Sequence, residues 1–189
     1  MKKFLLVLAA VCCVATVSAK KSVVETVKDS KWSVGLRAGN GLQAQAEMFL
    51  NKTNYVELRF GLGTGANFQG LCVHSASADF TALFNWNCKN WNWTPKFATW
   101  FLDAGCGFNI GGSDMVMYSG LAGQVKFGLK FKKVPIRLAI DYTPVFGIQH
   151  HFGKYYTYSS YCYDNAYSRK TAFFGNGLAN AAVSATWCF

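Results

Sequence analysis

Apolar and polar side chains alternate along most of the chain from Trp32 to its last residue. In the final segment, 180–189, an apolar residue occupies every second position from Val183 onward, ending on Trp187 and Phe189. A period of two places these side chains on one face of a β-strand. The same alternation predicts eight strands, over about 31–39, 42–50, 55–65, 78–87, 97–110, 119–131, 136–146 and 180–189.

The predicted connections between these strands differ in length on the two sides. Short turns are predicted at three places, 51–54, 88–96 and 132–135, longer loops at 66–77 and 148–170, and a further loop at 111–118. The connection near Asn40 and Gly41 is unusually short and departs from this rule. An even number of strands with short turns on the side of both termini is typical of a bacterial outer-membrane barrel. Both termini are then expected in the periplasm.

The composition is that of a membrane protein that lacks spanning helices. After the N-terminal run, no segment approaches the roughly 18 unbroken apolar residues of a spanning helix. The chain is nevertheless 51% hydrophobic and 16% aromatic, with 18 glycines. A closed barrel is the remaining structure that satisfies every backbone group within a bilayer. We therefore predict an all-β fold, an eight-stranded antiparallel up-and-down transmembrane β-barrel.

The first residues have the pattern of a secretory signal. Lys2 and Lys3 precede an apolar run over 4–17, and the small residues at 17–19 form a cleavage site. The run is too short for a spanning helix of about 20 residues. We predict a signal peptide at 1–19, a periplasmic lead-in at 20–30 and the barrel at 31–189. A lipidated N-terminus at Cys12 or Cys13 is the alternative.

The charged residues of strands one to seven are expected to face the lumen. Buried charges are tolerated only when they are paired, so this pattern predicts a lumen ion network. A soluble sandwich would instead have an apolar interior. Because an eight-stranded barrel has room for little besides side chains, a structural role is favoured over a proton or ion path. The network comprises five basic and five acidic residues: Arg37, Glu47, Glu57, Arg59, Asp79, Asp103, Lys126, Lys130, Arg137 and Asp141.

The tryptophans are all predicted at the periplasmic end of the barrel. Indole rings prefer the headgroup region of a bilayer, so this clustering predicts an aromatic girdle. The alternative is that tryptophan is simply favourable in strands, which does not predict a one-sided distribution. The girdle comprises Trp32, Trp86, Trp91, Trp93, Trp100, Trp187 and the terminal Phe189.

Four segments carry a resemblance to a known family: WSVGLRAG at 32–39, NYVELRFGLG at 54–63, WFLDAGCGF at 100–108 and the stretch 123–144. The chain resembles the small eight-stranded outer-membrane barrels of the OmpA-transmembrane-domain and OmpX type. It is most similar to uncharacterised outer-membrane β-barrel or porin-family proteins of Bacteroidota. The resemblance implies a Gram-negative outer-membrane location and lipid and lipopolysaccharide as partners. The Trp187-x-Phe189 ending resembles the signal read by the barrel-assembly machinery.

Two features qualify this resemblance. The cysteine count is high for such barrels, and no peptidoglycan-binding domain is expected. The formal net charge of +10 does not indicate nucleic-acid binding, because a secreted chain is not expected to meet nucleic acid. The basic residues are expected either to attract anionic headgroups or lipopolysaccharide phosphates, or simply to be solvated in turns and loops. We expect a monomer.

Candidate chemical sites are few. Cys72 and Cys162 both fall in predicted outer loops and are the candidate disulfide. Cys106 is expected to face lipid, and Cys88 and Cys188 to lie across the barrel from each other. The cysteine spacings match no zinc pattern. No metal or cofactor is expected.

Two histidine-containing segments are candidate functional sites, one for a metal ion and one for catalysis. His150 and His151 head the long loop, but a metal site needs more convergent ligands. His74, Ser75 and Asp79 lie where small barrels that modify lipid A carry catalytic residues, although ordinary polar loop residues are the favoured interpretation.

Three functions remain open. The first is a non-enzymatic surface protein, structural or adhesive, with a tyrosine-rich loop at 153–170. The second is a narrow transporter of small or hydrophobic solutes. The third is a lipid A-modifying enzyme.

Overall fold

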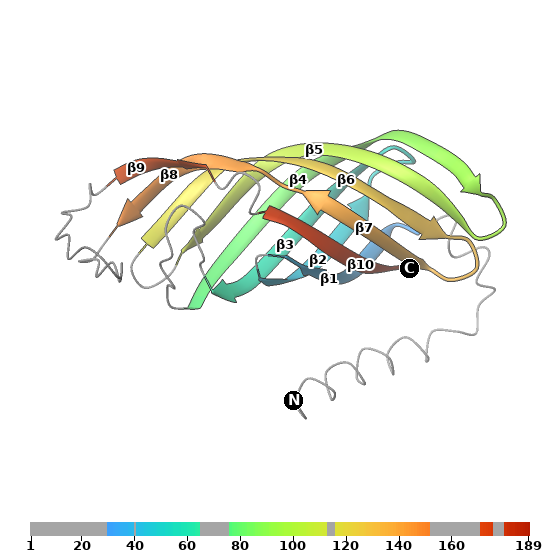
Figure 1. Cartoon of the computed structure of the whole chain (residues 1–189), viewed down its shortest axis with the longest axis horizontal. Coiled ribbons are helices and arrows are strands. Elements are labelled where there is room, and N and C mark those ends of the chain that lie inside the picture. The colour runs from blue at the N-terminus through green and yellow to red at the C-terminus, as the bar shows by residue number, and fades with distance from the viewer. Residues whose placement is uncertain (1–29, 40, 65–75, 113–115, 152–170, 176–179) are drawn as a thin grey trace, which may run out of the picture.

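The computed structural model describes residues 30–39, 41–64, 76–112, 116–151, 171–175 and 180–189 (Figure 1). The signal peptide predicted at 1–19 lies outside these residues, as does the lead-in up to 29. Ten β-strands make up most of the described chain: β1 Trp32–Ala38, β2 Leu42–Phe49, β3 Asn54–Thr64, β4 Ala76–Thr94, β5 Ala98–Gly112, β6 Val116–Phe131, β7 Ile136–Tyr142, β8 Val145–His151, β9 Thr171–Gly175 and β10 Ala181–Cys188.

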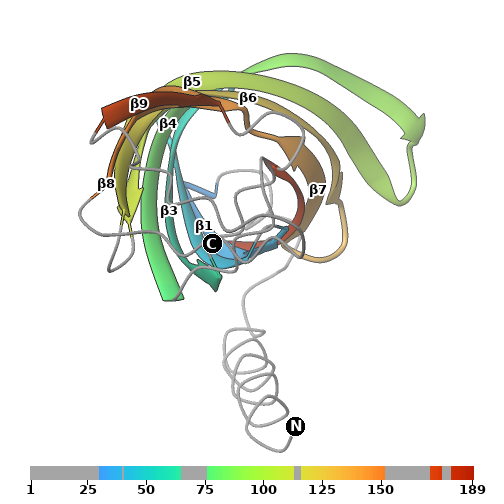
Figure 2. The same cartoon turned by 60° about the vertical axis from the view of Figure 1, so that its left-hand side comes forward.

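These ten segments form a closed eight-stranded barrel. Each strand from β1 to β6 pairs antiparallel with the next one, and β7 and β8 both pair with β6 as two halves of one barrel strand. In the same way β9 pairs with β8 and β10 pairs with β7, forming the eighth strand. The pairing of β10 with β1 closes the sheet, as Figure 2 shows. The predicted fold, an antiparallel up-and-down barrel of eight strands, is confirmed.

The seventh barrel strand is interrupted at Pro144. The Gly123 N–H donates to the Pro144 carbonyl at 2.9 Å. In a hydrogen-bonded antiparallel pair the two opposed residues exchange two such bonds, but proline has no N–H to return the second. The Thr143 N–H donates to the Asn180 carbonyl at 3.1 Å, so the neighbouring strand stays attached across the break.

Burial alternates along the strands and separates two faces. On β3, Leu58, Phe60 and Leu62 are 42%, 52% and 63% exposed, whereas Glu57 and Arg59 between them are almost completely buried. The barrel therefore presents an apolar outer face and a polar lumen. This is the reverse of a soluble protein, in which the apolar side chains gather inside.

The two ends of the barrel are distinct. At one end, called here the turn end, β1 begins, β10 ends, and turns at 50–53, 95–97 and 132–135 join consecutive strands. Trp32 and Phe189 exchange backbone hydrogen bonds of 3.2 and 2.9 Å there, so the last residue takes part in closing the barrel. The opposite end is called the loop end.

One predicted turn is wrong. The segment 88–96 was expected to be a turn, but β4 continues to Thr94 and pairs with β5 through two register shifts, at Asn87/Lys89 and Trp91/Thr94. The Asn-rich sequence and Pro95 are typical of a turn. The strand continues instead because its residues up to Thr94 pair with residues on the long β5. The β4–β5 hairpin consequently reaches past the other turns and leans away from the barrel (Figures 1 and 2).

Other boundaries also shift. Residues predicted as loop belong to strands at 76–77, at 111–112 and 116–118, and at 148–151. The predicted strand 136–146 is split between β7 and β8. Lys89, on the extended part of β4, is exposed, so one strand does carry a charge away from the lumen.

Candidate functional site

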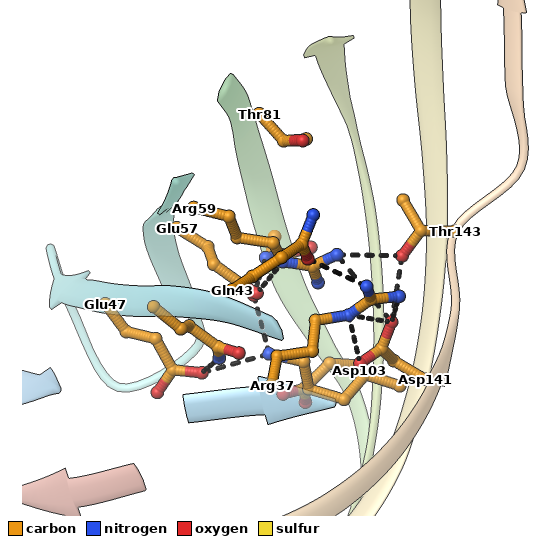
Figure 3. A network of polar contacts seen from close by, with 12 residues as sticks. Arg37, Gln43, Glu47, Glu57, Arg59, Thr81, Asp103, Asp141 and Thr143 are labelled. Atoms are coloured by element: carbon orange, nitrogen blue, oxygen red, sulfur yellow. Dashed lines mark hydrogen bonds and ion pairs between the residues drawn. The ribbon is translucent and has the colours of Figure 1, made fainter. Parts of the chain in front are cut away.

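Ion pairs link eight buried charged side chains into one chain through the lumen, and Figure 3 shows part of this network. Basic and acidic residues alternate along this chain, four of each, so it is electrically balanced. We call it the ion-pair chain; in order of contact it runs Asp103, Arg137, Glu47, Lys126, Glu57, Arg59, Asp141 and Arg37.

Lys126 occupies the centre of the ion-pair chain. From β6, its Nζ lies 3.0 Å from Glu47 Oε1 on β2 and 2.6 Å from Glu57 Oε2 on β3. These strands lie on different sides of the barrel, so the lysine spans the lumen. The three side chains are at most 2% exposed, and the attraction between them is therefore weakly screened by water.

One arm of the chain runs from Glu57 to Arg37. Arg59 Nε lies 2.6 Å from Glu57 Oε1, and its Nη1 lies 3.7 Å from Asp141 Oδ1. Arg37 Nη2 lies 2.7 Å from the same Asp141 oxygen. Thr143 bridges this group, because its hydroxyl accepts from Arg59 at 3.0 Å and donates to Asp141 at 2.9 Å.

The other arm runs from Glu47 to Asp103 through Arg137. The guanidinium donates to Glu47 Oε2 at 2.7 Å and to Asp103 Oδ2 at 3.1 Å. Its carbon lies 4.4 Å from the ring centroid of Phe101, a cation–π geometry that favours the charged form. Carboxylate and aromatic groups thus surround this arginine on several sides.

Neutral side chains complete the coordination of the carboxylates. Glu47 accepts from Ser33 and Gln45, Glu57 from Asn85, and Asp103 from Tyr55 and Asn87. Sequence reasoning had not assigned these residues to the network. The signal was available, since Tyr55 stands two positions before Glu57 and so shares its face of β3.

The remaining two predicted network residues lie at its margins. Asp79 accepts a 2.8 Å hydrogen bond from Gln43, and Gln43 accepts one of 2.8 Å from Arg37, so Asp79 joins through an amide. Lys130 lies beside Arg137 in the register of β6 and β7.

Polar atoms without hydrogen-bond partners occur beside the ion-pair chain. Within the described residues they include Arg59 Nη2, Asn85 Oδ1 and both amide atoms of Gln124. Gly105 pairs with Asn85 on one side and Gln124 on the other, and a Cβ on Gly105 would overlap Asn85 Oδ1. The glycine therefore leaves space that the amide of Asn85 occupies. Buried polar atoms of this kind are commonly satisfied by water.

An apolar layer also lies on the inner face. Leu83, Ala122 and Val145, from β4, β6 and β8, form a cluster in which each side chain is at most 3% exposed. Their neighbours along the same strands, Thr81, Gln124 and Thr143, are buried polar residues. The lumen is thus filled by packed side chains of both kinds.

The six tryptophans all lie toward the turn end. Trp86 on β4 pairs with Asn54 at the start of β3, and Trp187 pairs with Val34 and Ile136. Trp32 and Phe189 are joined by backbone hydrogen bonds, and their side chains are 45% and 54% exposed. The remaining three lie on the β4–β5 hairpin and gather against Phe127 of β6: Trp91, Trp93 and Trp100.

The other candidate residues are spread over the structure. Cys72, Cys162, His74 and Ser75 lie outside the described residues. Cys88 and Cys106 are exposed free thiols and Cys188 is buried. His150 Nδ1 lies 3.0 Å from Thr171 Oγ1. Among the described side chains, no group of three or more His, Cys, Asp or Glu is placed to hold a metal ion.

No helix in the described segments is both long and apolar enough to cross a membrane. Comparison of the chain with protein-family models, with curated proteins and with solved structures finds no match.

Proposed function

We propose that the chain is an integral outer-membrane β-barrel protein with periplasmic termini and a structural or surface-interaction role, neither an open pore nor an enzyme. The observation that carries this proposal is the pairing of an apolar outer face with a lumen filled by the ion-pair chain. The resemblance of the sequence to small outer-membrane barrels supports the location.

The outer face is suited to lipid rather than water. Leu121, Ile140, Phe146 and Phe173 are 75%, 62%, 62% and 88% exposed on it. Soluble monomers rarely expose a continuous apolar surface of this kind. The pairing of β10 with β1 also closes the sheet around the body of the barrel, which reduces the number of unpaired backbone groups that a bilayer would penalise strongly.

The lumen argues against an open pore. A solute passing through would have to displace contacts that cross it, such as Lys126 to Glu57 at 2.6 Å and Arg59 to Asp141 at 3.7 Å. Removing one partner of a buried ion pair costs about 3–5 kcal/mol. Because the lumen is filled by packed side chains, we assign the interaction with other molecules to the loop end of the barrel. The tyrosine-rich segment at 153–170, outside the described residues, is the proposed adhesive element.

A narrow transporter is the second candidate. It is favoured by the unpartnered polar atoms of Arg59, Asn85 and Gln124, because water bound to them would provide part of a hydrated path. The third candidate, a lipid A-modifying enzyme, depends on His74. An unchanged lipid A mass profile in a His74→Ala strain would remove it.

Planar-bilayer conductance separates the first two candidates. The purified barrel is added to a bilayer, and a large porin added afterwards verifies that channels are detected. We expect no discrete events from the wild type. The Glu57→Ala/Lys126→Ala variant, which keeps the lumen charge balanced while shortening two side chains that cross it, is expected to conduct. Discrete events from the wild type would contradict the closed lumen and support the transporter.

A further inference from the structure

The exposed charged side chains of the described residues are all lysines, and all of them lie at the turn end. The five described acidic residues belong to the lumen, so none of them neutralises this end. The lysines stand before β1, in the β2–β3 turn, on the β4–β5 hairpin and in the β6–β7 turn: Lys31, Lys52, Lys89, Lys96, Lys132 and Lys133.

The β4–β5 hairpin combines this charge with exposed aromatic rings. Trp91 stacks on Trp93 with ring centroids 5.2 Å apart, and Trp93 lies 5.7 Å from Trp100. Trp93 and Phe97 remain 61% and 59% exposed. An indole ring, with its polar N–H, beside lysine side chains is a combination that the headgroup region of a bilayer favours.

The β6–β7 turn braces the hairpin in its extended position. Lys132 Nζ donates to the Pro95 carbonyl at 2.8 Å and to Asn92 Oδ1 at 3.4 Å. The Lys132 backbone N–H donates to the Phe97 carbonyl at 3.0 Å. These bonds hold Lys132 and the adjacent Lys133 against the turn that carries Lys96.

We propose that this hairpin, with the β6–β7 turn, is a binding surface for anionic phospholipid headgroups. The inference rests on the proposed orientation, in which the turn end faces the phospholipid leaflet. The phosphates contact the lysine ammonium groups, while Trp93 and Phe97 enter the interface beside them. Anionic headgroups are favoured because they complement the charge of this surface, which carries exposed lysines and, among the described residues, no exposed acidic side chain.

Quenching of tryptophan fluorescence by brominated lipids measures this preference directly, since every tryptophan lies toward the turn end. The barrel is reconstituted in phosphatidylcholine bilayers that contain a fraction of brominated phosphatidylglycerol or brominated phosphatidylcholine. We expect several-fold stronger quenching by the anionic lipid. A lysine near an anionic surface contributes about fivefold in binding. The K89Q/K96Q/K133Q variant should therefore remove most of this several-fold preference, as should high salt. Lys132 is left in place because it braces the hairpin.

The matched control is K31Q/K52Q, which removes charge from the same end but not from the hairpin. It should retain most of the preference. Equal quenching by both lipids in the wild type would overturn the inference and leave an acidic polypeptide as the alternative occupant. An unchanged preference in the triple variant would also overturn it. A protein that fails to enter bilayers, with quenching by neither lipid, would instead contradict the proposed membrane location.

Discussion

Removal of the Lys126 charge is the most direct perturbation of the ion-pair chain. In Lys126→Met the side chain keeps a similar length, but Glu47 and Glu57 lose the ammonium group that lies 3.0 and 2.6 Å from them. We expect a folded barrel with a lower free energy of unfolding, because two carboxylates are left in the lumen with one cation fewer.

The magnitude follows from the contacts that are lost. Loss of one partner from a buried ion pair costs about 3–5 kcal/mol. Here both carboxylates keep other donors, since Arg137 and Ser33 still bind Glu47, and Arg59 and Asn85 still bind Glu57. The expected loss is therefore at the lower end of that range, about 3 kcal/mol.

Urea unfolding in detergent micelles, followed by tryptophan fluorescence, gives the measurement. Lys52→Met, at an exposed turn, is the control and should leave the unfolding midpoint unchanged. The double variant Lys126→Met/Glu47→Gln restores the charge balance, so its loss should fall short of the sum of the single losses by about 1 kcal/mol or more. A Lys126→Met barrel as stable as the wild type would refute the view that the ion-pair chain stabilises the fold.

Three further predictions concern packing, closure and the bilayer. Gly107→Ala should destabilise the barrel by about 1–3 kcal/mol in the same urea assay, because a Cβ there would overlap the backbone of Ala82 and Leu83. The control Gly123→Ala should be tolerated, because its Cβ would lie 3.6 Å from Pro144 Cγ. Deletion of Phe189 removes its backbone bonds to Trp32 and should reduce the assembled fraction in outer membranes more than deletion within the predicted loop 153–170; normal assembly would count against its role in closure. A membrane-impermeant maleimide should label Cys88 in open membrane fragments and spare Cys106 and Cys188. Cys106 pairs with Phe84 on the apolar outer face, and Cys188 is buried. Rapid labelling of Cys106 would show that the outer face is exposed to water.

The sequence was sufficient to predict the faces of the strands, because alternation depends only on neighbouring residues. Arg37, Glu57 and Lys126 could be assigned to the lumen from that pattern alone. Their pairing could not. Arg37 meets Asp141, 104 positions away, and Lys126 meets Glu57, 69 positions away. Such contacts depend on the register with which the barrel closes, which no local pattern specifies.

The extent of β4 is the clearest failure of sequence reasoning. Asn87, Asn90, Asn92 and Pro95 are typical turn residues. The length of β4 is set instead by pairing with β5, and Trp91 lies opposite Trp100 across that pair. The same difficulty applies to Thr143–Pro144, where a proline interrupts hydrogen bonding while the barrel strand continues as β8.

The central claim is that this chain is a closed barrel embedded in the outer membrane, and heat-modifiable gel mobility of the native protein tests it most directly. Outer membranes are separated from inner membranes by density, dissolved in dodecyl sulfate, and run with and without boiling. We predict that the protein is found in the outer-membrane fraction and that the unboiled sample migrates differently from the boiled one, because the folded barrel resists the detergent. A soluble protein whose mobility is the same in both samples would contradict the account.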